Sequence, residues 1–267
     1  ETTNGAARFR RLLSFVGLLL AAPSVQSAGL PCAFATVPCL IEAPVVGAGP
    51  TAIKLSRPTP HQVALRVGLA EADITPPHGF PMAGYYHERL ADGVIDPLKA
   101  KAIVFRGAHE DAALVVCDLI GISVDLAQAV RQRASQQTGI PVSNIVISAT
   151  HSHTAPDYSG ELYRFLGGER RDAVRAAYIE KLISGPADAI ARAHAAAMPA
   201  VLEAGSATQQ TPVSFNRRFV TRDGSVRTWM TLDHPDVVRS AGPIDPEIGL
   251  LLVRSADGTP RGVVSNF

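Results

Sequence analysis

Apolar and polar residues are arranged along this chain in short runs that predict strands separated by polar turns. Residues 63–74, 98–105 and 112–119 are rich in Val, Ile, Leu and Ala, a composition typical of strands. The last two runs flank a polar turn at residues 106–111 and therefore predict a β-hairpin. The Ile-Val-Ile sequence at residues 145–147 predicts a further strand.

Two longer segments carry apolar residues at helical spacing. In the first, Ser123 or Asp125 is placed to cap a helix that runs to about Thr138, and Gly139 is placed to end it. The second covers about residues 172–197 and has one apolar stripe. These two segments predict the helical part of the fold.

The later part of the chain contains one break signal and three further strands. Pro186 follows a glycine inside the second helix, and the pair is expected to break or kink it. His194 is interpreted as a residue of the helix C-terminus rather than a ligand. Residues 201–207 predict a strand, and residues 248–254 and 262–267 predict a hairpin. The order of elements predicts an α/β architecture in which layered β-sheets are flanked by helices.

Composition narrows the class of protein. The chain has 267 residues, of which 46% are hydrophobic and 18% are charged, and its formal net charge is +1. These values are typical of a globular protein large enough for one large domain or two small ones. The near-neutral balance provides no basic surface for nucleic acid, so no nucleic-acid partner is expected.

The first 28 residues are typical of a signal peptide. Three arginines precede an apolar run over residues 12–22, and small residues lead to a cleavage position after Ser27 or Ala28. The apolar run is shorter than a membrane span. A buried core helix is the alternative, but the arginines and the small residues favour export. The protein is therefore expected to be secreted or periplasmic.

Residues 29–62 form a linker rich in Pro, Ala and Gly. Cys32 and Cys39 lie within it, and an oxidising compartment would allow them to pair. Cys117 lies on a predicted buried strand and is interpreted as an inert core thiol. Three cysteines make neither a disulfide framework nor a cysteine-based zinc site.

Candidate chemistry is concentrated in residues 144–156, NIVISATHSHTAP. Here a strand gives way to His151 and His153, and in an extended segment their side chains would point to the same side. His-x-His spacing is common among metal ligands, and the carboxyl end of a strand is a usual place for a site. A polar surface loop or a structural histidine remains the alternative.

Two other groups have open interpretations. Tyr85, Tyr86 and His87 lie in an aromatic loop and either line a site or pack on the surface. Asp118 ends a predicted buried strand, where it either orients a ligand histidine or caps a turn.

Several separated pieces of the sequence are similar to one family. VGLAEADITPP, DPLKAKAIVF, LVVCDLIGI, NIVISATHSHTAP, the Asn216-Arg217 pair and DPEIGLLLV together resemble the N-terminal catalytic region of the neutral/alkaline, non-lysosomal ceramidases, over roughly residues 66–267. The histidine-containing piece is the most specific of them. The resemblance implies that residues 63–267 are the N-terminal part of a ceramidase-like catalytic domain.

The resemblance also implies an activity and site residues. These ceramidases are zinc-dependent amidases that cleave N-acylsphingosine to sphingosine and a fatty acid, and zinc can polarise an amide carbonyl. His151 matches the first zinc ligand, and His153 matches a histidine that can hydrogen-bond substrate or the developing oxyanion. Arg217 resembles an arginine of the substrate pocket. The expected partner is a lipid-like amide, with peripheral contact to a membrane surface.

The chain departs from the family pattern in two respects. It has HSHTAP where the family typically has HTHSGP, so Ala155 replaces a glycine. The family's second zinc-binding histidine and its later serine, glutamate and tyrosine site residues are expected beyond Phe267, so the chain by itself is expected to be inactive. The alternatives are a metal-dependent hydrolase of another amide or ester on the same fold, and a non-catalytic secreted domain.

Overall fold

The computed structural model describes residues 17–20, 54–56, 65–159, 172–210, 213–231 and 233–267. In chain order its elements are β1 (Gly17–Leu20), β2 (Lys54–Ser56), β3 (Arg66–Asp73), β4 (Lys99–Arg106), β5 (Asp111–Cys117), α2 (Val124–Thr138), the 3-10 helix η1 (Val142–Asn144), β6 (Ile145–Ala149), α3 (Asp172–Ala195), β7 (Met198–Thr208), β8 (Phe219–Thr221), β9 (Val226–Arg227), β10 (Val237–Ser240), β11 (Glu247–Ser255) and β12 (Pro260–Asn266). Both predicted hairpins, β4–β5 and β11–β12, are confirmed as antiparallel pairs.

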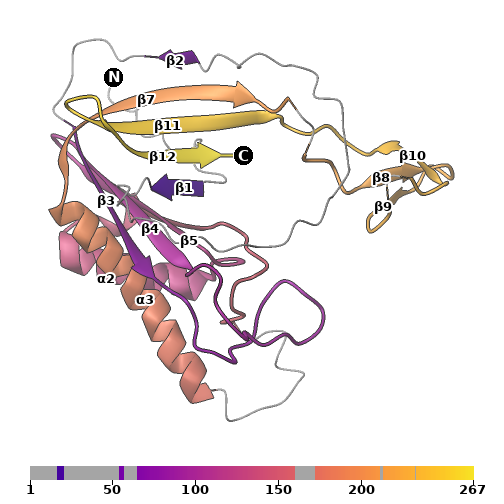
Figure 1. Ribbon diagram of the computed structural model, residues 1–267, viewed down its shortest axis with the longest axis horizontal. Coiled ribbons are helices and arrows are strands. Elements are labelled where there is room, and N and C mark those ends of the chain that lie inside the picture. Colours follow the sequence, from indigo (N-terminus) through magenta and orange to yellow (C-terminus); the bar gives the residue numbers. More distant parts are fainter. Residues whose placement is uncertain (1–16, 21–53, 57–64, 160–171, 211–212, 232) are drawn as a thin grey trace, which may run out of the picture.

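One large sheet runs through the molecule in the order β1-β12-β11-β7-β3-β4-β5-β6, and β2 pairs with β7. Strand β7 joins its two halves. Met198 and Pro199 pair with β3, whereas the rest of β7 pairs with β11. The two halves therefore lie across from one another, with β7, β11 and β12 on one side and β3, β4 and β5 on the other (Figure 1).

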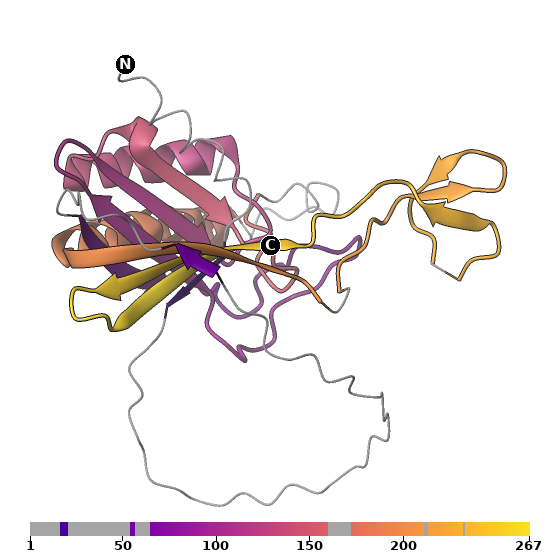
Figure 2. The ribbon, with the colours of Figure 1, turned by 90° about the horizontal axis from the view of Figure 1, so that it is seen from above.

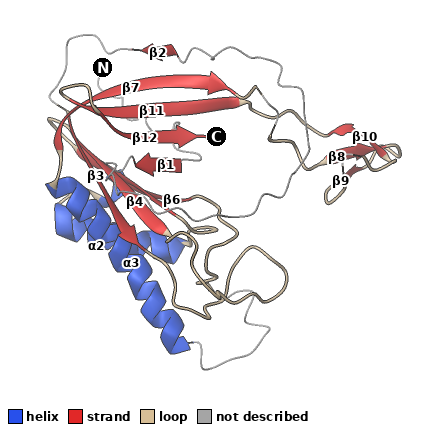
Figure 3. Cartoon of the chain, in the orientation of Figure 1, coloured by secondary structure: helices blue, strands red, loops and turns tan. Residues whose placement is uncertain are grey.

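Alternation of side chains along β4 and β5 produces two apolar clusters. Val104 and Val115 belong to the cluster beneath α2 and α3, which cover one face of this half of the sheet (Figure 3). Ile103 and Leu114 point the other way and pack with Val253 of β11. Because successive residues of a strand face opposite sides, each strand contributes to both clusters. The predicted layered α/β fold, with sheets flanked by helices, is confirmed.

Helix α2 begins and ends where its capping residues predict. The Ser123 hydroxyl accepts a hydrogen bond from the backbone N–H of Leu126. Gly139 has a φ of 78° and donates its N–H to the carbonyl of Ser135. The helix places Leu126 and Val130 in the core beneath it.

Of the two outcomes expected at Gly185-Pro186, the break is wrong, because α3 continues through Pro186 as one helix, and the kink stays a prediction. Packing against the sheet stabilises it. A side chain at Gly185 would meet Ile74 at 3.3 Å, and the Tyr178 hydroxyl donates to the Ile74 carbonyl at 2.6 Å. Tertiary contacts of this kind offset the cost of a proline inside a helix. His194 lies near the helix C-terminus, as predicted, with Nε2 3.0 Å from Oδ2 of Asp111.

Strands β8, β9 and β10 form a separate small sheet, in the order β10-β8-β9, that projects from the body of the molecule (Figure 2). We call residues 219–240 the arm. Trp229, in the arm, has its ring 6.2 Å from that of Tyr86. The arm therefore contacts the loop that follows β3.

The structure describes two short parts of the predicted N-terminal segments. Strand β1 lies within the predicted signal peptide, and β2 lies within the predicted linker. β1 pairs with β12, and the signal peptide stays a prediction. Cys32 and Cys39 lie outside the described residues. No helix in the described part of the chain is both long and apolar enough to span a bilayer.

Candidate active site

The candidate site begins where the parallel strands β5 and β6 end together. Beyond β6, the backbone N–H of Thr150 donates to the Cys117 carbonyl at 3.0 Å, and that of Ser152 donates to the Leu119 carbonyl at 3.1 Å. These bonds hold the histidine-bearing segment against the end of β5. This is the edge of an open sheet where ligands usually bind.

The His151 ring is fixed by one hydrogen bond. Its Nδ1 lies 2.7 Å from the carbonyl oxygen of Ile120. A carbonyl oxygen only accepts, so Nδ1 carries a proton, and the tautomer that fits this bond has its lone pair on Nε2. Metal-binding histidines are commonly oriented in this way. The backbone of His151 has a φ of 61°, a left-handed conformation that is uncommon outside glycine and often found at functional sites.

The His151 and His153 rings lie side by side, with centroids 5.1 Å apart and planes at 79°. They do not reach this arrangement along an extended strand, which was the predicted route. Strand β6 ends at Ala149, and the left-handed residue at 151 leads into a turn. Both side chains are exposed. The pair therefore faces open space in the described structure.

The loop of residues 79–91 packs against the histidine segment. Ala83 donates its N–H to the Ala155 carbonyl at 2.8 Å, and Asp157 donates to the Pro81 carbonyl at 2.9 Å. Ala155 is fully buried and has no positive φ. Ala155, where the resemblance implies a glycine, is therefore accommodated without backbone strain, and the loop is held to the segment on both sides of it.

Two residues of this loop make direct contact with His153. The Tyr85 ring meets the His153 ring edge-on, with centroids 6.2 Å apart, so Tyr85 lines the site as one of its two interpretations predicted. Arg89 donates from Nη2 to the His153 carbonyl at 2.7 Å. Sequence reasoning missed Arg89, since a lone arginine in a loop carries no signal for a contact 64 residues away.

The other predicted residues lie apart from the histidine pair. Arg217 is exposed in the segment before β8, and no described contact joins it to His151 or His153. Asp118 accepts a hydrogen bond from the backbone N–H of Lys99 at 2.9 Å, which favours its interpretation as a turn cap. Cys117 is fully buried, and burial raises the pKa of its thiol, as suits an inert core residue.

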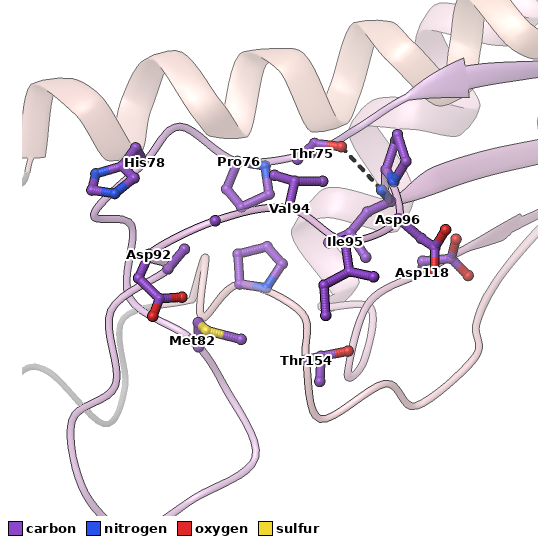
Figure 4. A pocket seen from close by; sticks show the side chains of 15 residues that line it. Thr75, Pro76, His78, Met82, Asp92, Val94, Ile95, Asp96, Asp118 and Thr154 are labelled. Carbon is purple, nitrogen blue, oxygen red and sulfur yellow. Dashed lines mark hydrogen bonds between the residues drawn. The ribbon is translucent and has the colours of Figure 1, made fainter. Parts of the chain in front are cut away.

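A cavity of about 700 Å³ adjoins the histidine segment (Figure 4). Thr154 and Pro156 of that segment form part of its wall. Most of the remaining wall is apolar, with three carboxylates and a histidine among its residues: Thr75, Pro76, His78, Met82, Ala91, Asp92, Gly93, Val94, Ile95, Asp96, Pro97, Leu98 and Asp118. A cavity of this size and character suits an apolar ligand with a polar end.

The described residues do not form a complete metal site. Among them, no group of three or more His, Cys, Asp or Glu side chains is arranged to hold a metal ion. His151, with its anchored Nδ1 and its available Nε2, fits the role of one zinc ligand. A four-coordinate zinc ion would need further ligands from outside these residues.

The described fold is a layered α/β domain in which His151 and His153 lie just beyond the carboxyl end of β6, the strand parallel to β5. The chain belongs to the neutral/alkaline non-lysosomal ceramidase family, because the family model described as "Neutral/alkaline non-lysosomal ceramidase, N-terminal" matches residues 65–267. No curated protein matches the chain.

One solved structure agrees with this assignment at the level of the fold. The crystal structure of neutral ceramidase from Pseudomonas aeruginosa is 24% identical with a TM-score of 0.55, covering 74% of this chain and 31% of that chain. A structure described as ceramidase complexed with C2 is 25% identical with a TM-score of 0.49, covering 74% of this chain and 30% of that one. The chain thus spans about 31% of the length of the Pseudomonas enzyme.

Proposed function

We propose that the protein is a zinc-dependent amide hydrolase that acts on N-acylsphingosine, the substrate class that the name of its family implies. The observation that carries the proposal is the anchored His151 ring, which lies inside the region matched by the family model. Its Nδ1 proton is committed to the Ile120 carbonyl, so its Nε2 is available to hold zinc. Zinc would supply Lewis-acid polarisation of the amide carbonyl.

The remaining residues have separate roles in this proposal. His153, next to His151, donates a hydrogen bond from its ring N–H to the carbonyl oxygen of the substrate, where negative charge develops. Arg217 contacts polar groups of the substrate with its guanidinium. The apolar wall of the cavity takes up part of an alkyl chain. The protein is exported through its N-terminal leader and meets its substrate at a membrane surface.

The histidine roles predict different losses in the full natural polypeptide. His151→Ala should remove most of the bound zinc and of the activity, because one ligand is lost from a four-ligand shell. His153→Ala should lower the rate by about 100-fold and leave most of the zinc bound. Zinc content by atomic emission and turnover of N-acylsphingosine measure the two effects.

His194→Ala is the matched control, since this histidine pairs with Asp111 at the opposite end of β5 and should leave zinc unchanged. Unchanged zinc in the His151 variant would refute the ligand role. If the protein hydrolysed short-chain amides or esters and not N-acylsphingosine, the proposed substrate would be wrong. The protein would then be a hydrolase of another amide or ester with the same fold.

A further inference from the structure

We infer that Arg89 is a positioning residue that sets the direction of the His153 ring. The inference rests on the proposed function, because Arg89 would affect the reaction only through the role proposed there for His153. Arg89 lies at the end of the loop of residues 79–91, on the side of that loop that faces the histidine segment. Three sets of contacts carry the inference.

The first set joins two stretches of backbone through one nitrogen. Arg89 Nη2 donates to the Ala83 carbonyl at 3.0 Å and to the His153 carbonyl at 2.7 Å. A charged donor makes stronger hydrogen bonds than a neutral one. The guanidinium therefore ties the main chain of His153 to the loop that surrounds its ring.

The second set acts on the ring that touches His153. The guanidinium carbon of Arg89 lies 3.8 Å from the centroid of the Tyr85 ring, within the range of a cation–π contact. The edge of Tyr85 in turn meets His153 at 78°. Arg89 therefore holds both the backbone of His153 and the aromatic ring against which the imidazole packs.

The third set limits how far the imidazole can move. Gly84 has a φ of +93°, and a Cβ there would lie 2.6 Å from Cγ and Nδ1 of His153. The His151 ring closes another side, at 5.1 Å between centroids. With Tyr85, Gly84 and His151 around it, the direction of the ring depends on the loop staying in place. Besides the backbone bonds at Ala83 and Asp157, Arg89 adds a hydrogen bond from the loop to the backbone of His153 itself.

Direction matters at this position because a hydrogen-bonding group acts on a transition state only at the right distance and angle. A displacement of about 1 Å at a reacting group costs about 100-fold in rate. Lysine cannot substitute, since its ammonium lacks the planar face that lies over Tyr85. Arg89→Lys therefore keeps the positive charge and removes the contacts that the guanidinium makes with the Tyr85 ring and the two carbonyls.

The kinetic test uses the full natural polypeptide with zinc bound. Arg89→Lys should lower kcat on N-acylsphingosine by about 10- to 100-fold, with bound zinc and melting temperature close to those of the wild type. Arg192→Lys is the matched control, because Arg192 also donates to a backbone carbonyl, that of Glu71 on β3. It should leave kcat unchanged. Equal losses in the two variants would overturn the inference.

A double-mutant cycle separates positioning from general stabilisation. In a His153→Ala background, Arg89→Lys should have almost no further effect on kcat, because the group through which it acts is already gone. A loss of the same size in both backgrounds would show that Arg89 acts elsewhere, and would overturn the inference.

A spectroscopic measurement makes the test independent of the substrate. In ¹H–¹³C spectra of histidine-labelled protein at one fixed pH, Arg89→Lys should move the ring signals of His153 and leave those of His194 in place. Tyr85→Leu removes the aromatic ring on which Arg89 lies and keeps the hydrogen bonds of Arg89 to the Ala83 and His153 carbonyls. This variant should move the same signals, and it replaces Arg89→Lys in the test if Arg89→Lys does not fold. Unmoved His153 signals would overturn the inference whatever the activity. Moved signals without ceramide hydrolysis would support it and reject the proposed function.

Discussion

His151 and His153 are held in different ways, although their rings are neighbours. The His151 ring is fixed by a bond from its own Nδ1 to the Ile120 carbonyl. The His153 ring has packing neighbours on several sides, and Arg89 binds its backbone carbonyl. Under the proposed function, the bonded ring of His151 suits a fixed ligand, and the ring of His153, held by its surroundings, would present its nitrogens to the substrate.

A substitution at Gly84 tests whether the packing around the His153 ring matters. Gly84→Ala should lower kcat by about 10-fold or more, because the new methyl group would push the His153 ring from its place. Gly79→Ala is the matched control: Gly79 also has a positive φ, +75°, but its Cβ would meet nothing within 4 Å. Turnover and thermal unfolding should be measured on both. Equal kcat in the two variants would contradict the crowding of His153 by residue 84.

At the scale of the element, aspartates stabilise the turns of the β-hairpins. In the β11–β12 turn, Asp257 Oδ1 accepts hydrogen bonds from the Ser255 hydroxyl at 2.6 Å and from the Thr259 N–H at 3.0 Å. These bonds lower the pKa of Asp257 to about 2. Asp223 in the arm is bonded in the same way by Thr221 and Ser225, and its pKa is also lowered. Each turn is thus stabilised by a carboxylate in its charged form.

The lowered pKa of Asp257 predicts how the stability of this hairpin depends on pH. A carboxyl whose pKa is lower in the folded state stabilises the fold fully above its unfolded pKa, which is about 3.9. That contribution is lost as pH falls through the folded pKa of about 2. The stability difference between wild type and Asp257→Asn should therefore shrink between about pH 4 and pH 2. Urea unfolding across this range measures it, and a difference independent of pH would contradict the prediction.

At the scale of the whole molecule, the layers meet so closely that two backbones touch. Gly68 of β3 lies against α3, and a Cβ there would lie 1.7 Å from the carbonyl oxygen of Ala193. Next to this contact, α3 packs into the core through its buried residues Leu182 and Ile190. The absence of a side chain at residue 68 sets the distance between helix and sheet.

Gly68→Ala should therefore destabilise the whole domain. The new methyl group would push α3 from the sheet, because its Cβ would overlap a backbone oxygen that cannot turn aside, and overpacking of a core costs about 1–3 kcal/mol or more. Gly249→Ala, on β11, is the matched control, since its Cβ would make only an ordinary contact at 3.8 Å. Chemical unfolding should show a large loss for the first variant and a change below about 1 kcal/mol for the second. Similar free energies of unfolding for both would contradict the close approach of α3.

Local signals account for the parts of this protein that its sequence determines by itself. The hairpins follow from apolar runs around polar turns, and α2 follows from Ser123 and Gly139, because these residues act on neighbours a few positions away. The histidine segment could be recognised for the same reason, as a short motif at the end of a strand. Family membership could be read from such pieces without knowing how they pack.

Contacts between distant residues decide the rest. Packing against Ile74 carries α3 through Pro186 where the local signal predicts a break. The left-handed turn at His151, rather than a strand, brings the two imidazoles together. Arg89 reaches His153 across 64 residues of chain. Sequence alone singled out the histidine segment and the family, and the tertiary structure decided how the residues of that segment are held, since orientation depends on neighbours that only folding brings together.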